Sequence, residues 1–235
     1  MKVSKRVKAI NKNVDKEKEY TVEQAIKLLK DNSKVKFTET LNCAIRLGVD
    51  PRHADQMVRG TVSLPHGTGK KVSVLVIARG AQAEEALKAG ADYAGFEEYL
   101  EKIKGGWAEV DVIVATPDSM GELGKLGRVL GPKGLMPNPK SGTVTQDVAK
   151  AVKEVKAGKI EFRVEKAGIV HTALGKLDFS VEQLSENTRA FLQTIIKMKP
   201  SSAKGHYVKS LFLSSTMGTG LRITKDETAV STKHE

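Results

Sequence analysis

The run GELGKLGRVLGPKGLMPNPKSGT, residues 121–143, concentrates glycine, proline and lysine near the middle of the chain. Gly124 and Gly127 fall where the pattern is helical. Each costs about 1 kcal/mol against alanine there, which indicates close packing or the close approach of a partner. The pair Gly131-Pro132 predicts the end of this helix, and two later prolines favour extended backbone. The run is therefore predicted to be a stiff, cationic arm that presents its lysines.

The segments on either side of this arm alternate between strands and helices. VSVLVIA (72–78) and VDVIVAT (110–116) are continuous apolar runs, typical of strands that are buried on both faces of a parallel sheet. AQAEEALKAGA (81–91) and VAKAVKEVKAG (148–158) have the periodicity of helices. The alternation predicts a small, mostly parallel α/β unit that closes near Gly158.

Both ends of the chain have a different strand pattern. From Leu41 to Val49 apolar and polar residues alternate, which predicts a half-buried strand with a polar outer face. Thr21 and Ser180 are predicted N-caps of amphipathic helices, and residues 1–18 are expected to form a frayed, basic lead-in. Further strands are predicted at 58–64, 160–164, 169–174, 207–214 and 221–223. The two ends resemble each other, and the middle third interrupts them.

Charge follows the same division. Residues 66–159 contain 14 Lys or Arg and 12 Asp or Glu, so +9 of the total formal charge of +11 lies in the flanks. A basic balance of this kind favours a polyanionic partner for the flanks. Aromatic residues make up only 5% of the chain, which argues against a platform that stacks base after base along a single strand. Folded RNA is the better expectation.

The compartment and the cofactors follow from what the sequence lacks. Cys43 is the only cysteine, which excludes an internal disulfide, and its place in an alternating strand predicts a core thiol. No apolar run approaches the roughly 20 residues that cross a bilayer, and the basic N-terminus is not followed by the apolar core of a signal peptide. We therefore expect a cytoplasmic protein with no membrane partner.

The enzyme motifs that this sequence suggests are incomplete. Gly67-Thr68-Gly69-Lys70 resembles part of a phosphate-binding loop, but Leu64 and Lys71 stand where that loop needs a glycine and a serine or threonine. The helix after residues 72–78 lacks the further glycines of a dinucleotide site. The five histidines have no metal-ligand spacing, and no serine lies in a G-x-S-x-G turn. No catalytic residue, metal or cofactor is predicted.

Three classes of function are weighed against this sequence: an RNA-binding structural protein, a nucleotide-dependent α/β enzyme and a DNA-binding regulator. The enzyme lacks its motifs, and the regulator lacks a recognisable helix for a DNA groove. Strand ends and turns with polar residues suit folded RNA better.

The arm sequence GKLGRVLGPKGLMPNPKSGTV closely resembles the signature of the bacterial-type family of large ribosomal subunit protein one. FTETLNCAIRLGVDPR, VHTALGKLDF and FLSSTMGTGLRI extend the resemblance over nearly the whole chain. It implies a split α/β sandwich, an antiparallel sheet with helices, made from residues 1–66 and 159–235. A Rossmann-like three-layer α/β domain, residues 67–158, would interrupt it.

The resemblance also implies partners and contact residues. The discontinuous domain would bind a helical junction of large-subunit rRNA at the mobile stalk, with the protein present as a monomer within the ribosome. Phosphates would be held by Lys36, Arg163 and Lys166, and hydrogen bonds to sugars and base edges made by Thr38, Glu39, Glu165, Ser215 and Thr216. Phe37 and Met217 would add apolar contact, and Gly218 would allow close backbone approach. His171 is not included.

The inserted domain has its own implied partner. Arg128, Lys133 and Lys140 would face deacylated tRNA as it leaves the exit site. Family members also bind a leader in their own messenger and thereby repress its translation, so this mRNA is a third expected RNA partner.

Overall fold

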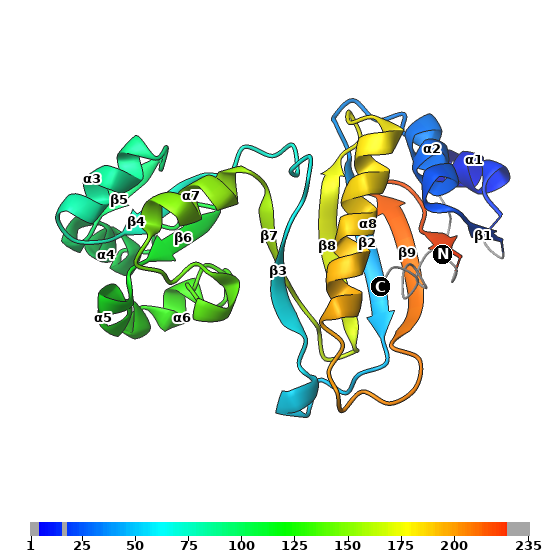
Figure 1. Ribbon diagram of the computed structural model, residues 1–235. Coiled ribbons are helices and arrows are strands. Elements are labelled where there is room, and N and C mark those ends of the chain that lie inside the picture. Colours follow the sequence, from blue (N-terminus) through cyan, green and yellow to red (C-terminus); the bar gives the residue numbers. More distant parts are fainter. Residues whose placement is uncertain (1–4, 16–17, 225–235) are drawn as a thin grey trace. The chain divides into compact units, whose positions relative to one another are not determined.

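The computed structural model describes residues 5–15 and 18–224, and their mixed α/β structure confirms the predicted fold class. The chain divides into two compact units. Unit 1 comprises the chain up to Lys70 and from Phe162 onward, and unit 2 comprises Lys71–Glu161. Figure 1 shows both units.

Unit 1 is built on a five-stranded sheet in the order β1-β10-β9-β2-β8. β2 (Thr40–Leu47) lies between β8 (Ile169–Lys176) and β9 (Val208–Ser215) and is antiparallel to both. Strands from the two ends of the chain are therefore interleaved in one sheet. At the edge, β1 (Glu19–Tyr20) runs parallel to β10 (Leu221–Ile223).

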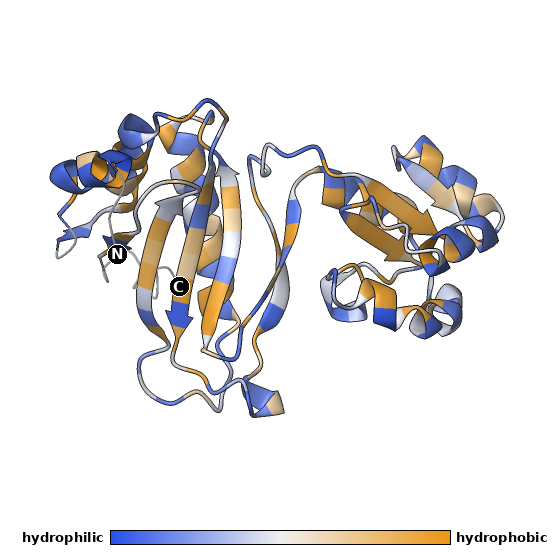
Figure 2. Ribbon diagram, turned by 180° about the vertical axis from the view of Figure 1, so that it is seen from behind, coloured by the Kyte–Doolittle hydropathy of each residue, from blue (hydrophilic) through white to orange (hydrophobic). Residues whose placement is uncertain are grey.

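Helices cover one face of this sheet. The predicted caps of α2 (Val22–Asn32) and α8 (Val181–Lys197) are confirmed, since Thr21 and Ser180 each form a capping box with a glutamine three residues on. Within the predicted basic lead-in, residues 5–13 form α1 (Lys5–Asn13), which Ile10 anchors because its side chain is buried. In Figure 2 no helix lies over β9, β2 and β8, so their other face is open among the described residues.

Two shorter elements lead out of unit 1. β3 (Arg59–Ser63) follows the 3-10 turn η1 (Ala54–Gln56) and forms a two-stranded ribbon with β7 (Lys159–Arg163). Phe162 packs edge-to-face on Phe191 of α8, with ring centroids 5.4 Å apart. The end of β7 is thereby attached to the core of unit 1.

Unit 2 has three layers, with a parallel sheet between two layers of helices. β4 (Val74–Ile77) lies between β5 (Tyr93–Gly95) and β6 (Val112–Ala115). Alternate residues of β4 pack on opposite helical layers: Val74 and Val76 face α3 (Ala81–Lys88) and α7 (Val148–Lys156), and the other residues face α4 (Glu97–Lys104), α5 (Met120–Lys125) and α6 (Gly127–Leu130). β4 and β6 are hydrophobic over their full length in Figure 2, as predicted for buried parallel strands.

The sequence prediction omitted β5 and α4 from this unit. β5 is only three residues long and is held by its ladder to β4, so its own pattern carries little signal. The helix ending at Gly131-Pro132 is confirmed, since α6 ends at Leu130. The 3-10 turn η2 (Pro117–Ser119) precedes the arm, and a second one, η3 (Pro139–Ser141), lies within its last residues.

Two further predictions concern burial. Cys43 is 1% exposed, which confirms the core thiol, and burial raises the pKa of this thiol well above its ordinary value. Among the described residues, no helix has both the length and the apolar composition needed to cross a bilayer.

Asn187 of α8 joins three segments of unit 1. Its side chain is fully buried, and its Nδ2 donates to the carbonyl oxygens of Leu174 (2.8 Å) and Gly67 (2.9 Å). Its Oδ1 accepts from the backbone N–H of His66 at 3.1 Å. The amide thus holds residues 66–67, which follow β3, against β8.

We expect Asn187→Leu to lower the free energy of unfolding by about 2–4 kcal/mol, because it leaves three buried backbone groups without partners. Urea denaturation followed by circular dichroism measures this. Gln193→Leu, at an exposed position of the same helix, is the control and should change stability by less than about 0.5 kcal/mol. Equal effects of the two substitutions would contradict the role assigned to Asn187.

Candidate nucleic-acid interface

The loop before β2 and the turn after β9 meet at one end of the unit 1 sheet. Their exposed residues form what we call the turn cluster: Lys36, Phe37, Thr38, Thr216, Met217 and Gly218. Leu41 pairs with Ser215 in the ladder, which brings the two segments together although they are far apart in sequence. Phe37 and Met217 are among the exposed large hydrophobic residues, at 52% and 40%. Exposed apolar side chains beside a lysine offer a surface for a partner with both charge and flat apolar faces.

Glu39 supports this cluster from beneath. It is 2% exposed, and its carboxylate accepts from the Met217 N–H and from the Ser33 hydroxyl, both at 2.9 Å. Burial would raise the pKa of Glu39, but hydrogen bonds from Ser215, Met217 and Ser33 outweigh it and hold the pKa below its ordinary value. The carboxylate therefore fixes the turn. Ser215 is 5% exposed and belongs to the same support.

The glycine and the threonine of the turn also have local partners. A Cβ on Gly218 would run into the Ser215 hydroxyl, so the bare backbone is needed for packing inside the turn. The Thr216 hydroxyl accepts from the Thr40 N–H at 3.1 Å, which still leaves its own proton for another acceptor. The turn is held in place from both sides.

Arg163, Glu165 and Lys166 lie at the other end of β2. The carbonyl of Gly168, in the same turn, accepts from the N–H of Leu47, the last residue of β2. All three side chains are exposed. We call them the distal cluster. The eight residues of β2 separate the two clusters by roughly 20–25 Å at the usual rise per residue of a strand, so the site residues of the sequence prediction form two groups.

The open face of the sheet connects the two clusters. β2 turns Asn42, Ala44 and Arg46 to this face, and register places His171 and Phe212 on either side of Ala44. Phe212 is 40% exposed. The sequence prediction recognised this face as polar but did not name these residues as contacts. The alternation of polar and apolar residues along these strands is the sequence pattern that indicates them.

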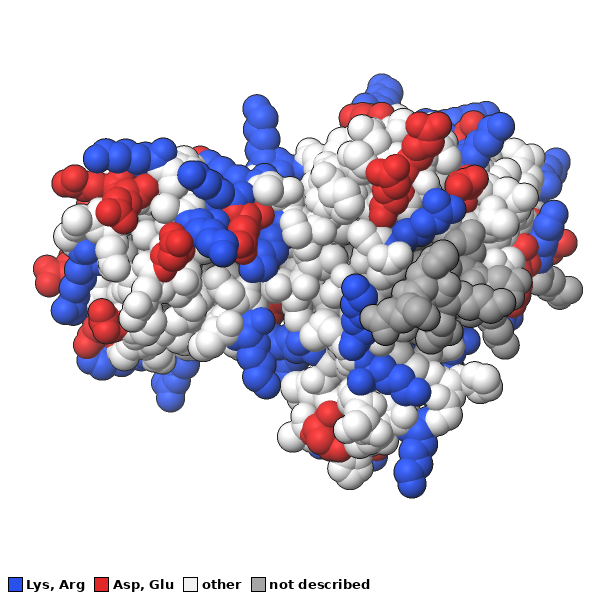
Figure 3. Space-filling model, in the orientation of Figure 1, with Lys and Arg blue, Asp and Glu red and all other residues white. Residues whose placement is uncertain are grey.

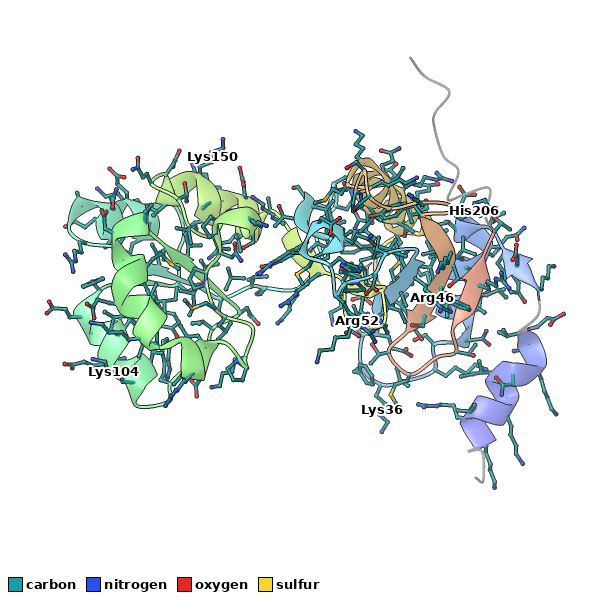
Figure 4. All side chains as sticks on the ribbon, turned by 90° about the horizontal axis from the view of Figure 1, so that it is seen from below. Lys36, Arg46, Arg52, Lys104, Lys150 and His206 are labelled. Atoms are coloured by element: carbon teal, nitrogen blue, oxygen red, sulfur yellow. The ribbon has the colours of Figure 1, made fainter. Side chains whose placement is uncertain are left out.

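Additional cations gather beyond the distal end of β2. Figure 3 shows Lys and Arg around η1 and the loop from α8 to β9. Arg52 before η1, Lys204 in the loop and Lys209 at the start of β9 are exposed. In Figure 4, Lys36, Arg46 and Arg52 lie on the side of unit 1 away from α8. The helix-free side therefore carries cations along its length.

The arm of unit 2 is ordered by its own polar groups. The Asn138 N–H donates to Thr143 Oγ1 at 2.8 Å, and the Asn138 side chain accepts from the Lys140 N–H at 2.8 Å. Arg128, Lys133 and Lys140 are all exposed on this stretch. A Cβ on Gly124 or Gly127 would meet nothing within 4 Å, so close packing within the chain does not explain these glycines.

The fold is that of a mixed α/β protein in which strands from both ends of the chain share one sheet and the sequence between them forms a separate parallel unit. Residues 29–219 match the sequence profile of the "Ribosomal protein L1p/L10e family". The chain belongs to this family. It is a ribosomal protein rather than an enzyme, located with the cytoplasmic ribosome, as the sequence predicted.

Similar proteins span most of the chain. Large ribosomal subunit protein uL1 of Chlorobium phaeobacteroides is 61% identical over 213 residues, 91% of this chain and 93% of the relative. The protein of the same name from Protochlamydia amoebophila is 56% identical over 230 residues, 98% of each chain. That of Bacteroides thetaiotaomicron is 56% identical over 222 residues, 94% of this chain and 96% of the relative.

The support role of Glu39 predicts a pH-dependent stability. Because its folded-state pKa lies below the unfolded-state value, its stabilisation is complete above the unfolded-state pKa and is lost as the pH falls through the folded-state pKa. We expect Glu39→Gln to lower the free energy of unfolding by about 1–3 kcal/mol at pH 7, since hydrogen bonds to a charged acceptor are lost. Urea denaturation at neutral and at acidic pH measures the difference, which should shrink at acidic pH.

The control for Glu39 is Glu165→Gln, which removes an exposed carboxylate from the distal cluster. It should change stability by less than about 0.5 kcal/mol at either pH. A stability difference for Glu39→Gln that is independent of pH would show that the charge of Glu39 does not hold the turn.

Proposed function

We propose that this chain, a structural constituent of the large ribosomal subunit, binds large-subunit rRNA through the helix-free side of unit 1. The turn cluster, the open sheet face and the distal cluster form one continuous strip along β2. The single observation that carries the proposal is the turn cluster itself. A buried carboxylate holds an exposed Met and Gly beside Phe37 and Lys36, so that apolar, backbone and cationic groups are presented together at one fixed surface.

The two clusters are suited to different parts of an RNA. Lys36, Arg163 and Lys166 are exposed cations that would bind phosphates, which sets position and affinity. Phe37, Met217 and the Thr216 hydroxyl would contact sugars and bases exposed where helices meet. Contacts roughly 20–25 Å apart would select a helical junction of the right shape.

Within this proposal Glu39 and Ser215 position the turn, because both are buried. Glu165 remains an exposed acceptor for 2′-hydroxyls, and Thr38 an exposed hydroxyl on the loop. Gly218 serves the turn in two ways: it fits beside Ser215 on the inner side, and its outer side is exposed.

We further propose that unit 2 contacts tRNA at the exit site and assists its release, as part of the mobile stalk. Arg128, Lys133 and Lys140 are exposed on an arm that hydrogen bonds hold in shape. The glycines at 124 and 127 leave backbone that a phosphate chain can approach. The rRNA strip would also bind a messenger leader that mimics the junction, and such binding would repress translation of the chain's own operon.

If Arg163 binds phosphates and Met217 contacts the shape of the junction, substitutions of these two residues should have different effects on RNA binding. Arg163→Ala should weaken binding to the stalk junction and to an unrelated RNA duplex alike, and lower the salt slope of binding by about 0.7–0.9. Met217→Ala should weaken junction binding by about 1–3 kcal/mol with an unchanged slope, because it removes shape contact without charge. Filter binding over a series of KCl concentrations measures both quantities.

The matched controls for these variants lie in unit 2. Leu87→Ala truncates a side chain that is 50% exposed, and Lys88→Ala removes an exposed cation beside it. Both should leave junction affinity within about twofold. Normal binding by Met217→Ala would refute the turn cluster as a contact surface, whereas equal salt slopes for both cluster variants would refute the division of roles.

The proposal assigns rRNA to unit 1 and tRNA to unit 2, which deletion can test. Joining residues 1–66 to 159–235 through a short glycine linker keeps β3 and β7 whole. We expect a folded domain that keeps rRNA affinity within about a hundredfold, roughly 2.7 kcal/mol, and no longer contacts exit-site tRNA. Gel shift with the junction RNA and crosslinking to tRNA in reconstituted subunits measure the two functions.

A triple substitution in the full chain tests the same assignment without deleting unit 2. Replacing Arg128, Lys133 and Lys140 by alanine should reduce tRNA crosslinking and leave rRNA affinity unchanged. A larger loss of rRNA affinity in a folded deletion protein would place essential rRNA contacts in unit 2.

A further inference from the structure

Three of the chain's five Tyr and Trp residues lie together in unit 2. The ring centroids of Tyr93 and Trp107 are 5.5 Å apart, those of Tyr99 and Trp107 5.8 Å, and those of Tyr93 and Tyr99 6.0 Å. We call these rings the aromatic cluster. They come from β5, from α4 and from the turn after α4.

The aromatic cluster reaches the surface. Tyr93 is 39% exposed, and the other two rings are half-buried at the margin of the core. The Tyr99 ring lies against the backbone of Gly95, where an added Cβ would be 2.9 Å from Tyr99 Cδ2. β5 is the edge strand of its sheet in the described part of the chain. Aromatic side chains that lie together at a sheet edge are typical of a contact surface for a partner.

Charge around the aromatic cluster argues against RNA. Residues 92–111, which include all three rings, contain six Asp or Glu and two Lys, whereas residues 112–161 contain eight Lys or Arg and five Asp or Glu. One cation of α7 reaches the acidic stretch, since Lys156 forms an ion pair with Asp92 at 3.3 Å. Lys150 of α7 lies on the side of unit 2 opposite to Lys104 of α4 in Figure 4. The arm and α7 belong to the basic part, and the aromatic cluster belongs to the acidic part. A partner for the acidic part should be cationic.

The chain itself shows how a cation fits on this surface. The Lys102 ammonium lies 4.8 Å from the centroid of the Tyr99 ring. The same ammonium forms an ion pair with Glu98, one helical turn earlier. A ring face and a carboxylate thus hold one ammonium group together, which is a recurring mode of cation recognition.

We propose that the aromatic cluster docks a lysine- or arginine-rich segment of a partner protein. Cationic side chains of this segment would lie on the faces of Tyr93 and Trp107, and the carboxylates of α4 would surround them. The proposal is independent of the RNA contacts proposed for unit 1 and the arm, because it uses other residues and a partner of opposite charge.

The test uses the full chain and a fluorescein-labelled hexa-arginine peptide. Anisotropy measures affinity, and the emission of Trp107, the only tryptophan, reports binding at the cluster. Tyr93→Ala changes no charge and should weaken peptide binding by about two- to fivefold. Lys102→Gln should strengthen it by about two- to fivefold, because the Tyr99 face and the Glu98 carboxylate become free.

Two controls lie on α3, on the opposite face of the sheet from α4. Leu87→Ala and Lys88→Gln match the two substitutions in kind and should each change peptide affinity by less than about 1.5-fold. Thermal unfolding establishes that every variant is folded.

Titration with tRNA separates the alternative partner. Quenching of Trp107 by tRNA, together with weaker tRNA binding by Lys102→Gln, would assign the cluster to RNA and overturn the proposal. Peptide binding that leaves Trp107 emission unchanged, or that Tyr93→Ala does not weaken, would overturn it as well. An acidic hexa-glutamate peptide should not bind.

Discussion

The pairing of β2 with both β8 and β9 is the constraint on which the rest of this structure depends. It joins residues from the first fifth of the chain to residues from its last third, so the closure entropy of long loops must be overcome before the sheet forms. Apolar burial on the helix-covered face supplies the compensation: Leu41, Cys43 and Ile45 are each at most 1% exposed. The same pairing determines both ends of the sheet, and hence both clusters of the proposed RNA strip.

A consequence of this pairing is that a carboxylate can be buried at little cost. Glu39 lies where the loop before β2 meets the turn after β9, so donors from both segments reach it. An isolated buried carboxylate would be strongly unfavourable, but one with several donors remains ionised. The backbone N–H of Met217 points inward and donates to this carboxylate. The side chain of Met217 is exposed on the other side of the turn.

The parts of the fold that could be predicted from the sequence are those that neighbouring residues determine. The caps at Thr21 and Ser180 and the alternation of β2 are properties of neighbouring residues, and each was correct. β1 and β5 were missed because strands of two or three residues are specified by their partners. The exposed members of the turn cluster came from a family resemblance; the burial of Glu39 depends on donors 176 and 178 residues away, for which no local pattern exists. The separation into two clusters likewise required the register of β2.

Glycine in the arm illustrates where composition alone misleads. Gly124 and Gly127 suggested either tight packing or an approaching partner, and the empty space beside them excludes the first. Gly218 suggested an approaching partner, and its inner side proves to be filled by Ser215. The same residue type therefore lies in open space in unit 2 and in a packed turn in unit 1. Unit 2 also has two surfaces of opposite charge. The arm combines exposed backbone with cations, and the aromatic cluster combines ring faces with nearby carboxylates. Removing water from either surface is favourable only if the partner carries the opposite charge, so the sign of the charge determines which partner each surface can bind.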